Sequence, residues 1–186
     1  IINNCLIDPG VKVDKLPFFD IDYLFIALRA KSIGETIDIN FKCNNVVNGE
    51  KCVGVFPVSL DITKATVIKD ETLKDKVNIT GKIGAAFKYP SYTAMKNLES
   101  ESPLTREIKI LEASIDYLYD DEKLYPVKDM QPGELTSFLD GLTTAQLELL
   151  RPWINSFPSF EIRKEQVCPV CGFNHSIKYR DFSSFF

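Results

Sequence analysis

The sequence predicts an α+β protein in which two cysteine-bearing β-hairpins form a zinc-ribbon-like base, with a mainly helical unit inserted between them. Apolar residues alternate with polar ones around both cysteine pairs, and they recur at helical spacing between the pairs. Cys168 and Cys171 are separated by two residues, and Cys43 and Cys52 form the upstream pair. If one metal ion binds all four thiolates, residues about 120 positions apart must meet at the base of the insertion.

The N-terminal part, residues 1–62, is expected to hold one helix and the first hairpin. The turn-rich stretch 1–15 predicts an extended lead-in. Asp20 or a neighbouring residue can cap a helix that ends near Gly34. Its predicted apolar face contains Tyr23, Leu24, Ala27 and Leu28.

The first hairpin is predicted from a change of period. Alternation over residues 36–43 is typical of a half-buried strand, and Asn48-Gly49 is a strong signal for a tight turn. A return strand is expected over residues 53–62, broken by Gly54 and Pro57. Cys43 and Cys52 should therefore lie at the tip of this hairpin.

Residues 63–158 form the inserted region. Its first part predicts one or two glycine-interrupted strands within residues 76–90, followed by a helix over residues 103–119. The acidic run at 120–123 predicts a solvated turn. A short extended piece is expected at 124–127.

Two more helices are predicted, one within residues 132–142 and one after Thr143. Thr143 and Gln146 match a capping box, and Pro152 is expected to kink or shorten the second helix. The apolar stripes of both helices have two interpretations, packing in the protein's own core and contact with partner proteins. The candidate partner-contacting residues on them are Leu135, Phe138, Leu139, Leu147, Leu150 and Trp153.

Residues 159–186 are expected to form the second hairpin, folded around Cys168 and Cys171, and an aromatic C-terminal tail. All three parts are expected to make one compact unit. Exposed aromatic residues at a chain end favour aggregation, so the tail should be buried in this chain or in a neighbour. Its candidate partner-contacting residues are Phe182, Phe185 and Phe186.

The four paired cysteines are the candidate metal ligands. Residues 168–172 have the spacing of a zinc knuckle, in which a glycine relaxes the turn that aims backbone amides at sulfur. Eight residues separate Cys43 from Cys52, where two to four are usual. Two alternatives therefore stay open: His175 replaces one upstream cysteine, or the upstream pair stays free of metal. Four protein ligands leave no open position, so the expected cofactor is a structural Zn²⁺.

Composition limits the function further. The net charge of −4 comes without a block of Lys and Arg, which argues against nucleic acid as a partner, and no apolar run approaches the ~20 residues of a membrane span. Five cysteines without a dense framework favour reduced thiols in a cytoplasmic setting, with Cys5 as a free thiol. The chain lacks a glycine-rich phosphate loop and a nucleophile elbow. A thiol enzyme that uses Cys5 or Cys168 with His175 conflicts with the knuckle, so no enzyme is predicted.

Four collinear features carry a family resemblance. They are residues 23–35, residues 134–143, the Phe157-Pro158 pair, and the C-terminal knuckle that runs on to residues 181–186. In order and spacing they resemble the baseplate hub proteins of T-even-type, contractile-tailed phages, a family also described as hub assembly proteins or tail assembly chaperones. In such relatives two cysteine pairs look like a zinc ribbon, from which this chain departs in its wide Cys43–Cys52 loop.

The resemblance implies a virion-associated or assembly-phase protein that works on the hub of the tail baseplate. The expected partners are baseplate hub, tail tube or tape-measure proteins, with self-association as a further contact. The expected location is the virion tail, the host cytoplasm during assembly, or both.

The leading hypothesis is thus a non-enzymatic hub component or hub assembly chaperone that acts through protein–protein contacts and carries a structural zinc site. The alternative is a cellular zinc-ribbon adaptor or nucleic-acid-binding module. That alternative requires a basic face, which this acidic composition does not favour.

Overall fold

The computed structural model describes residues 2–8, 10–96 and 98–180. Helices and antiparallel strands alternate along this part of the chain, which confirms the mixed α+β class. Short 3₁₀ helices connect several elements. They are η1 (Val13–Lys15), η2 (Ile62–Lys64), η3 (Leu98–Ser100) and η4 (Val127–Asp129).

The chain forms two compact units. Unit 1 takes Ile1–Ile21 and Lys69–Pro158, and unit 2 takes Asp22–Ile68 and Ser159–Phe186. Each unit is thus built from two stretches that are distant in the sequence. The three-part division expected from the sequence stays a prediction, because a compact unit does not show which stretch folds alone.

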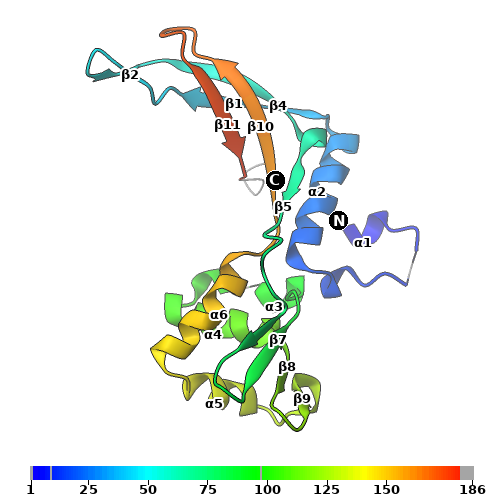
Figure 1. The fold of residues 1–186 in the computed structure, drawn as a ribbon. Coiled ribbons are helices and arrows are strands. Elements are labelled where there is room, and N and C mark those ends of the chain that lie inside the picture. The colour runs from blue at the N-terminus through cyan, green and yellow to red at the C-terminus, as the bar shows by residue number, and fades with distance from the viewer. Residues whose placement is uncertain (1, 9, 97, 181–186) are drawn as a thin grey trace. The chain divides into compact units, whose positions relative to one another are not determined.

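Two hairpins make up most of unit 2, and they lie side by side (Figure 1). β1 (Thr36–Lys42) pairs antiparallel with β4 (Val55–Asp61), and β10 (Ser159–Val167) pairs antiparallel with β11 (Asn174–Tyr179). β5 (Thr66–Ile68) extends the second sheet by pairing with the first residues of β10. The half-buried character of the first hairpin follows the predicted alternation, since buried and exposed residues alternate along β4.

A small hairpin fills the loop between β1 and β4. Its strands are β2 (Val46–Val47) and β3 (Glu50–Lys51), and they meet at Asn48 and Gly49. Both turn residues have positive φ, 52° and 87°, as a two-residue type I′ turn requires. The predicted tight turn is confirmed.

Unit 2 also buries one carboxylate. Glu161 of β10 is fully buried and pairs with Arg163 at 2.5 Å and with Arg180 at 2.7 Å. A buried charge is tolerated only when it is paired and hydrogen-bonded. The two arginines therefore allow β10 to place a charged residue on its inner face.

The helix α2 (Phe18–Ser32) ends near Gly34, as predicted, but its buried face differs from the prediction. It begins before Asp20, and its buried residues are Ile21, Ile26 and Ala30. Tyr23, which was expected on the buried face, is 52% exposed. The helix is apolar on nearly all sides, so its sequence does not select one face.

The N-terminal lead-in is partly helical rather than extended. α1 (Ile2–Cys5) is a short helix, and η1 lies at Val13–Lys15. The prediction of an extended stretch was wrong here. Turn-rich residues mark a break in regular structure but do not exclude a single helical turn beside it.

A four-stranded antiparallel sheet forms one side of unit 1. Its strands, in spatial order, are β6 (Lys76–Asn78), β7 (Gly84–Phe87), β8 (Ile115–Tyr119) and β9 (Leu124–Pro126). The acidic run that follows β8 forms the turn to β9, as predicted.

The predicted helix over residues 103–119 is correct only in its first part. α4 (Pro103–Ser114) begins at the expected proline, with Ser102 as its N-cap, but Ile115–Tyr119 is β8. The sequence of β8 is rich in β-branched and aromatic residues, and its pairing with β7 and β9 outweighs the helical spacing of its apolar residues.

Three more helices complete unit 1: α3 (Tyr92–Met95), α5 (Glu134–Asp140) and α6 (Thr144–Asn155). Thr143 caps α6 in the predicted capping box with Gln146. Pro152 lies inside α6, which continues to Asn155.

The core of unit 1 lies between its sheet and the helices α4, α5 and α6. Trp153 stacks on Phe87 and Tyr89, with ring centroids 5.1 and 5.3 Å away. The buried residues of this core are Ile79, Ala85, Phe87, Leu111, Ile115, Leu118, Leu135, Leu139, Leu150 and Trp153.

Candidate metal centre

The two hairpins of unit 2 supply the four paired cysteines. Cys43 directly follows β1 and Cys52 directly follows β3, while Cys168 directly follows β10 and Cys171 lies in the turn before β11. Each pair is therefore positioned by the backbone pairing of its own hairpin.

Their sulfur atoms form a tight group. All four lie within 4.8 Å of one another, with 3.7 Å between Cys43 and Cys171 and 3.9 Å between Cys52 and Cys168. A tetrahedral ion with metal–sulfur bonds of ~2.3 Å has sulfur–sulfur edges of ~3.8 Å, whereas a disulfide needs ~2.05 Å. The separations fit one tetrahedral ion, so the four cysteines could hold a metal.

The wide loop between Cys43 and Cys52 does not separate them, because its small hairpin brings its ends together. The backbone amide of Cys43 donates to the Gly54 carbonyl at 2.8 Å, and that of Cys52 donates to the Asn45 carbonyl at 2.9 Å. The β2–β3 hairpin projects beyond these bonds. The eight residues between Cys43 and Cys52 therefore do not keep the two cysteines apart in space.

The downstream pair has the turn that its sequence predicts. The Cys168 amide donates to the Phe173 carbonyl, and the Gly172 amide donates to the Cys168 carbonyl, both at 2.9 Å. Gly172 has φ of 72°, a conformation that L side chains rarely adopt. The glycine is therefore required by the turn that carries Cys171.

The environment shifts the thiol pKa values in opposite directions. Burial raises the pKa of Cys43 to about 12. The Gly54 amide lowers the pKa of Cys52, but burial and the Cys171 thiol outweigh it and the net shift is upward. The Phe173 backbone amide lowers the pKa of Cys171 to about 6. Without metal, one thiolate is favoured beside protonated thiols, and a bound cation would displace the remaining protons.

His175 lies beside the sulfur group rather than within it. Its Nε2 is 3.1 Å from the Cys43 sulfur, and its ring is buried against Phe41 and Phe173, with centroids 5.1 and 4.9 Å away. The set of mutually close ligand atoms contains the four cysteines and no histidine. His175 therefore contacts Cys43, whereas the thiol-enzyme hypothesis paired it with Cys5 or Cys168. Cys5 is exposed and lies outside the group.

Gly54 is a residue of the site whose role the sequence did not reveal. A Cβ at this position would lie 2.8 Å from the Cys168 sulfur and 3.4 Å from the Cys52 sulfur. The Gly54 amide also donates to the Cys52 sulfur at 3.4 Å. A glycine two residues after a cysteine, at the start of a predicted strand, was the available signal, since a glycine in a strand often marks a close approach.

The predicted partner-contacting residues fall into three groups. Leu135, Leu139, Leu150 and Trp153 are buried in the core of unit 1. Phe138 and Leu147 are only partly buried and line two surface pockets. The structure favours core packing for the first group, and partner contact stays a prediction for the second. Phe182, Phe185 and Phe186 lie outside the described residues.

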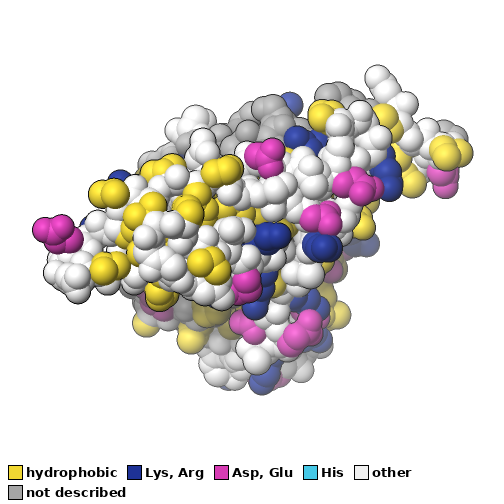
Figure 2. All heavy atoms as spheres, turned by 90° about the horizontal axis from the view of Figure 1, so that it is seen from above, with side chains coloured by type: hydrophobic (Ala, Val, Ile, Leu, Met, Phe, Trp, Pro, Cys, Tyr) yellow, Lys and Arg dark blue, Asp and Glu magenta, His cyan; other side chains and the backbone are white. Residues whose placement is uncertain are grey.

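Exposed apolar residues also lie close to the cysteines in the sequence. Figure 2 shows hydrophobic side chains, in yellow, gathered over the hairpins of unit 2. Val53 is 84% exposed and Val170 is 63% exposed. The others near the cysteines in sequence are Val46, Val47, Val55, Val167 and Phe173.

Comparison with known proteins identifies one family. The family model described as T4 bacteriophage base plate protein matches residues 1–186. No curated protein matches the chain, and no solved structure matches it. Among the described residues, no helix has the length and apolar character needed to cross a membrane.

Proposed function

The chain belongs to the T4 bacteriophage base plate protein family, and on that premise we propose that it is a component of the baseplate hub or a hub assembly chaperone. It acts through contacts with other phage proteins and carries a structural Zn²⁺. The proposed partners are hub, tail tube and tape-measure proteins.

The convergence of the four sulfur atoms carries the zinc proposal. Thiolates are soft ligands, and a set of four in tetrahedral arrangement is typical of structural zinc. Four protein ligands leave the ion no open position for substrate or water. The ion would hold the two hairpins as a zinc-ribbon-like base, and its binding energy would add to the stability of unit 2.

The same geometry supports a non-enzymatic role. The cysteine that contacts His175 is buried, and burial raises its pKa to about 12. Reactive cysteines instead have a low pKa and are at least partly exposed. Cys171 has both properties, but it belongs to the proposed metal ligands.

Native mass spectrometry of freshly purified protein tests the zinc proposal. We expect one zinc ion per chain, removed by a chelator and not taken up by the Cys43→Ser/Cys168→Ser variant. Cys5→Ser is the matched control, because Cys5 is exposed and outside the sulfur group, and it should bind zinc as the parent does. Freshly purified protein without zinc would refute the proposal.

A binding assay with purified hub, tail tube and tape-measure proteins tests the partner proposal. The exposed valines beside the cysteines are the proposed contact, so Val53→Asp/Val170→Asp should weaken binding at least about tenfold. The control Lys82→Asp lies in unit 1, is also exposed, and should have little effect. Failure of the parent protein to bind any of these components would contradict the proposal.

Quantitative mass spectrometry decides between a permanent component and a chaperone. A component of the mature tail is present in purified particles at a fixed ratio to other baseplate proteins. An assembly chaperone in the host cytoplasm is present in infected cells and depleted from particles.

A further inference from the structure

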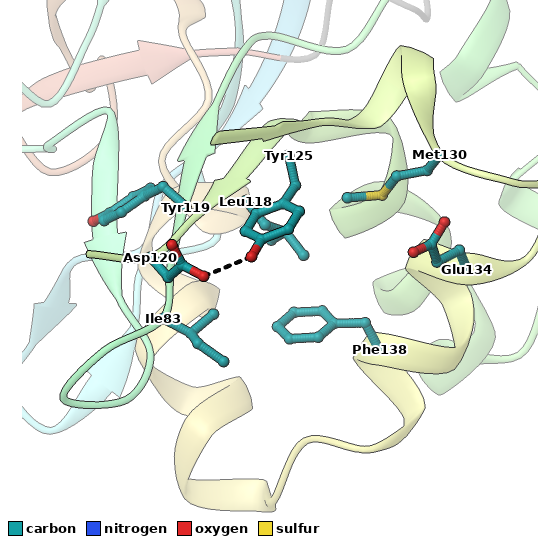
Figure 3. Close-up of a pocket in the computed structure, with 8 residues that line it drawn as sticks. All are labelled: Ile83, Leu118, Tyr119, Asp120, Tyr125, Met130, Glu134 and Phe138. Carbon is teal, nitrogen blue, oxygen red and sulfur yellow. Dashed lines mark hydrogen bonds between the residues drawn. The ribbon is translucent and has the colours of Figure 1, made fainter. Parts of the chain in front are cut away.

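A small pocket opens on unit 1 between the sheet and α5 (Figure 3). Leu118 and Tyr125 are register partners on β8 and β9, so their side chains share one face of the sheet. Ile83, Met130 and Phe138 of α5 also line this apolar side of the pocket. Figure 3 shows these side chains around a common space, with the carboxylates of Asp120 and Glu134 at its edges.

The size of the pocket limits what can enter. Its volume is about 200 Å³, below the ~300–1,000 Å³ of clefts that enclose a whole small molecule. A cavity of ~150 Å³ takes a benzene ring, so this pocket takes one large apolar side chain. The flexible thioether of Met130 suits such an occupant, because methionine adapts to the shape of what it contacts.

The rim of the pocket is strongly acidic. Residues 120–134 contain five carboxylates and two lysines, a formal charge of −3 within a chain whose total is −4. Asp121 and Glu122 are exposed in the turn next to the pocket, and Glu134 is exposed on its rim. This concentration of charge favours a cationic partner at the mouth.

Local contacts take up part of that charge: Glu134 accepts from the Gln131 amide at 3.0 Å, and Lys76 lies over the Tyr119 ring, 5.8 Å from its centroid. Asp120 accepts hydrogen bonds from the Tyr125 hydroxyl at 2.6 Å and from the amides of Glu122 and Lys123 at 2.8 Å, so its role in holding the turn is structural. Lys123 lies over the Tyr125 ring, 4.7 Å from its centroid. It offsets one charge of the turn, while Asp121 and Glu122 remain exposed beside it.

We propose that this pocket docks a short segment of another baseplate protein, which inserts one apolar side chain and carries Lys or Arg on both sides of it. The proposal uses the family membership but depends on neither the zinc site nor the hub assignment. A second copy of this chain carries a net charge of −4, which works against its docking at an acidic rim. Within residues 181–186, the three phenylalanines are accompanied by Asp181 and by no Lys or Arg.

The two methionines of this chain, Met95 and Met130, allow a direct test. With [methyl-¹³C]methionine, Met130 reports on the pocket, and Met95 of α3, which does not line it, is an internal control. Their signals are assigned with Met95→Leu and Met130→Leu. The probe is a short synthetic peptide with one phenylalanine flanked by lysine and arginine. We expect this peptide to shift the Met130 signal and to leave the Met95 signal in place.

Charge variants separate specific docking from general attraction. Asp121→Lys/Glu122→Lys should weaken peptide binding at least about tenfold. Asp38→Lys/Glu50→Lys changes exposed carboxylates of unit 2 by the same total charge and should change the affinity less than about twofold.

Four outcomes would overturn the proposal. The basic peptide leaves Met130 unmoved, or a peptide with glutamates in place of its lysines and arginines shifts Met130 equally. A peptide with the chain's own sequence 180–186 shifts Met130 more strongly than the basic peptide, which would make the tail the occupant. The Met130 signal depends on protein concentration without peptide, which would make a second copy the occupant.

Discussion

Gly54, Asn45 and His175 contact sulfur atoms of the cysteine group from outside it. Gly54 and Asn45 present N–H groups to sulfur, and such donors stabilise the negative charge of a thiolate. Neighbours of this kind also orient the ligands of a metal, and their loss typically costs ~10–100-fold in affinity. The site therefore depends on residues that are not themselves part of the four-thiolate set.

Replacing Gly54 by alanine should weaken metal binding by about tenfold or more, because the new Cβ would lie 2.8 Å from the Cys168 sulfur. Competition with a chromophoric chelator measures the affinity. Gly81→Ala is the control, since a Cβ there has no atom within 4 Å. Equal affinities for the two variants would show that the sulfur group tolerates the extra methyl.

His175 should act as a hydrogen-bond donor to Cys43 and not as a ligand. His175→Phe keeps an aromatic ring beside Phe41 and Phe173 but removes the N–H, so metal should be held about tenfold more weakly. The absorption spectrum of the Co²⁺-loaded variant should keep the pattern of four thiolates, and His175→Gln should restore part of the affinity. A changed Co²⁺ spectrum in His175→Phe would instead identify the histidine as a ligand.

At the scale of secondary structure, a local sequence pattern predicts the element correctly where the contacts with surrounding segments favour the same structure. The capping box of α6 and the Asn48-Gly49 turn are formed as their sequences predict. Ile115–Tyr119 has helical spacing but joins the sheet, because strand partners on both sides satisfy its backbone and bury its apolar residues. The same stretch supplies Leu118 to the pocket beside α5.

The capping box makes a measurable contribution to unit 1. Thr143→Ala removes the hydroxyl that accepts from the Gln146 amide at 3.3 Å, and should lower the free energy of unfolding by about 1 kcal/mol. Thr144→Ala, at the next position, removes no cap and should change stability by less than about 0.5 kcal/mol. Chemical denaturation followed by Trp153 fluorescence reports on both, and equal midpoints would contradict the prediction.

At the scale of the whole molecule, the four cysteines all lie in unit 2. Both units bury apolar residues, with a core around Trp153 in unit 1 and residues such as Phe56, Leu60 and Ile162 in unit 2. In unit 2, a bound metal would add its binding energy to the contacts of the two hairpins.

Chelation should therefore destabilise the units unequally. Hydrogen exchange of the metal-loaded protein, followed by mass spectrometry with and without chelator, should show faster exchange in β1, β4, β10 and β11. The strands and helices of unit 1 should change little. Equal acceleration throughout the chain would contradict this prediction.

Metal binding should tighten as the pH rises from about 6 to 8. Burial raises the pKa of Cys43 to about 12, and that of Cys52 is also raised, so both keep their protons in the metal-free protein across this range. Each proton that the metal displaces makes the apparent affinity about tenfold tighter per pH unit. Chelator competition at several pH values measures this slope, and an affinity independent of pH would refute the assignment of protonated thiols.

The residue pattern alone predicted the mixed class, the two hairpins around the cysteines, the turn at Asn48-Gly49 and the cap at Thr143. These features depend on backbone geometry within a few residues, so a short sequence specifies them. The family resemblance also came from the sequence, since collinear motifs need no coordinates.

Long-range packing determined the rest. The meeting of the two cysteine pairs, the face that α2 buries and the strand at Ile115–Tyr119 each depend on which distant segment lies alongside. The contact of Gly54 with sulfur and the acidic pocket beside α5 belong to this class too. Their free energies come from burial and pairing between residues far apart in the chain, which no local pattern encodes.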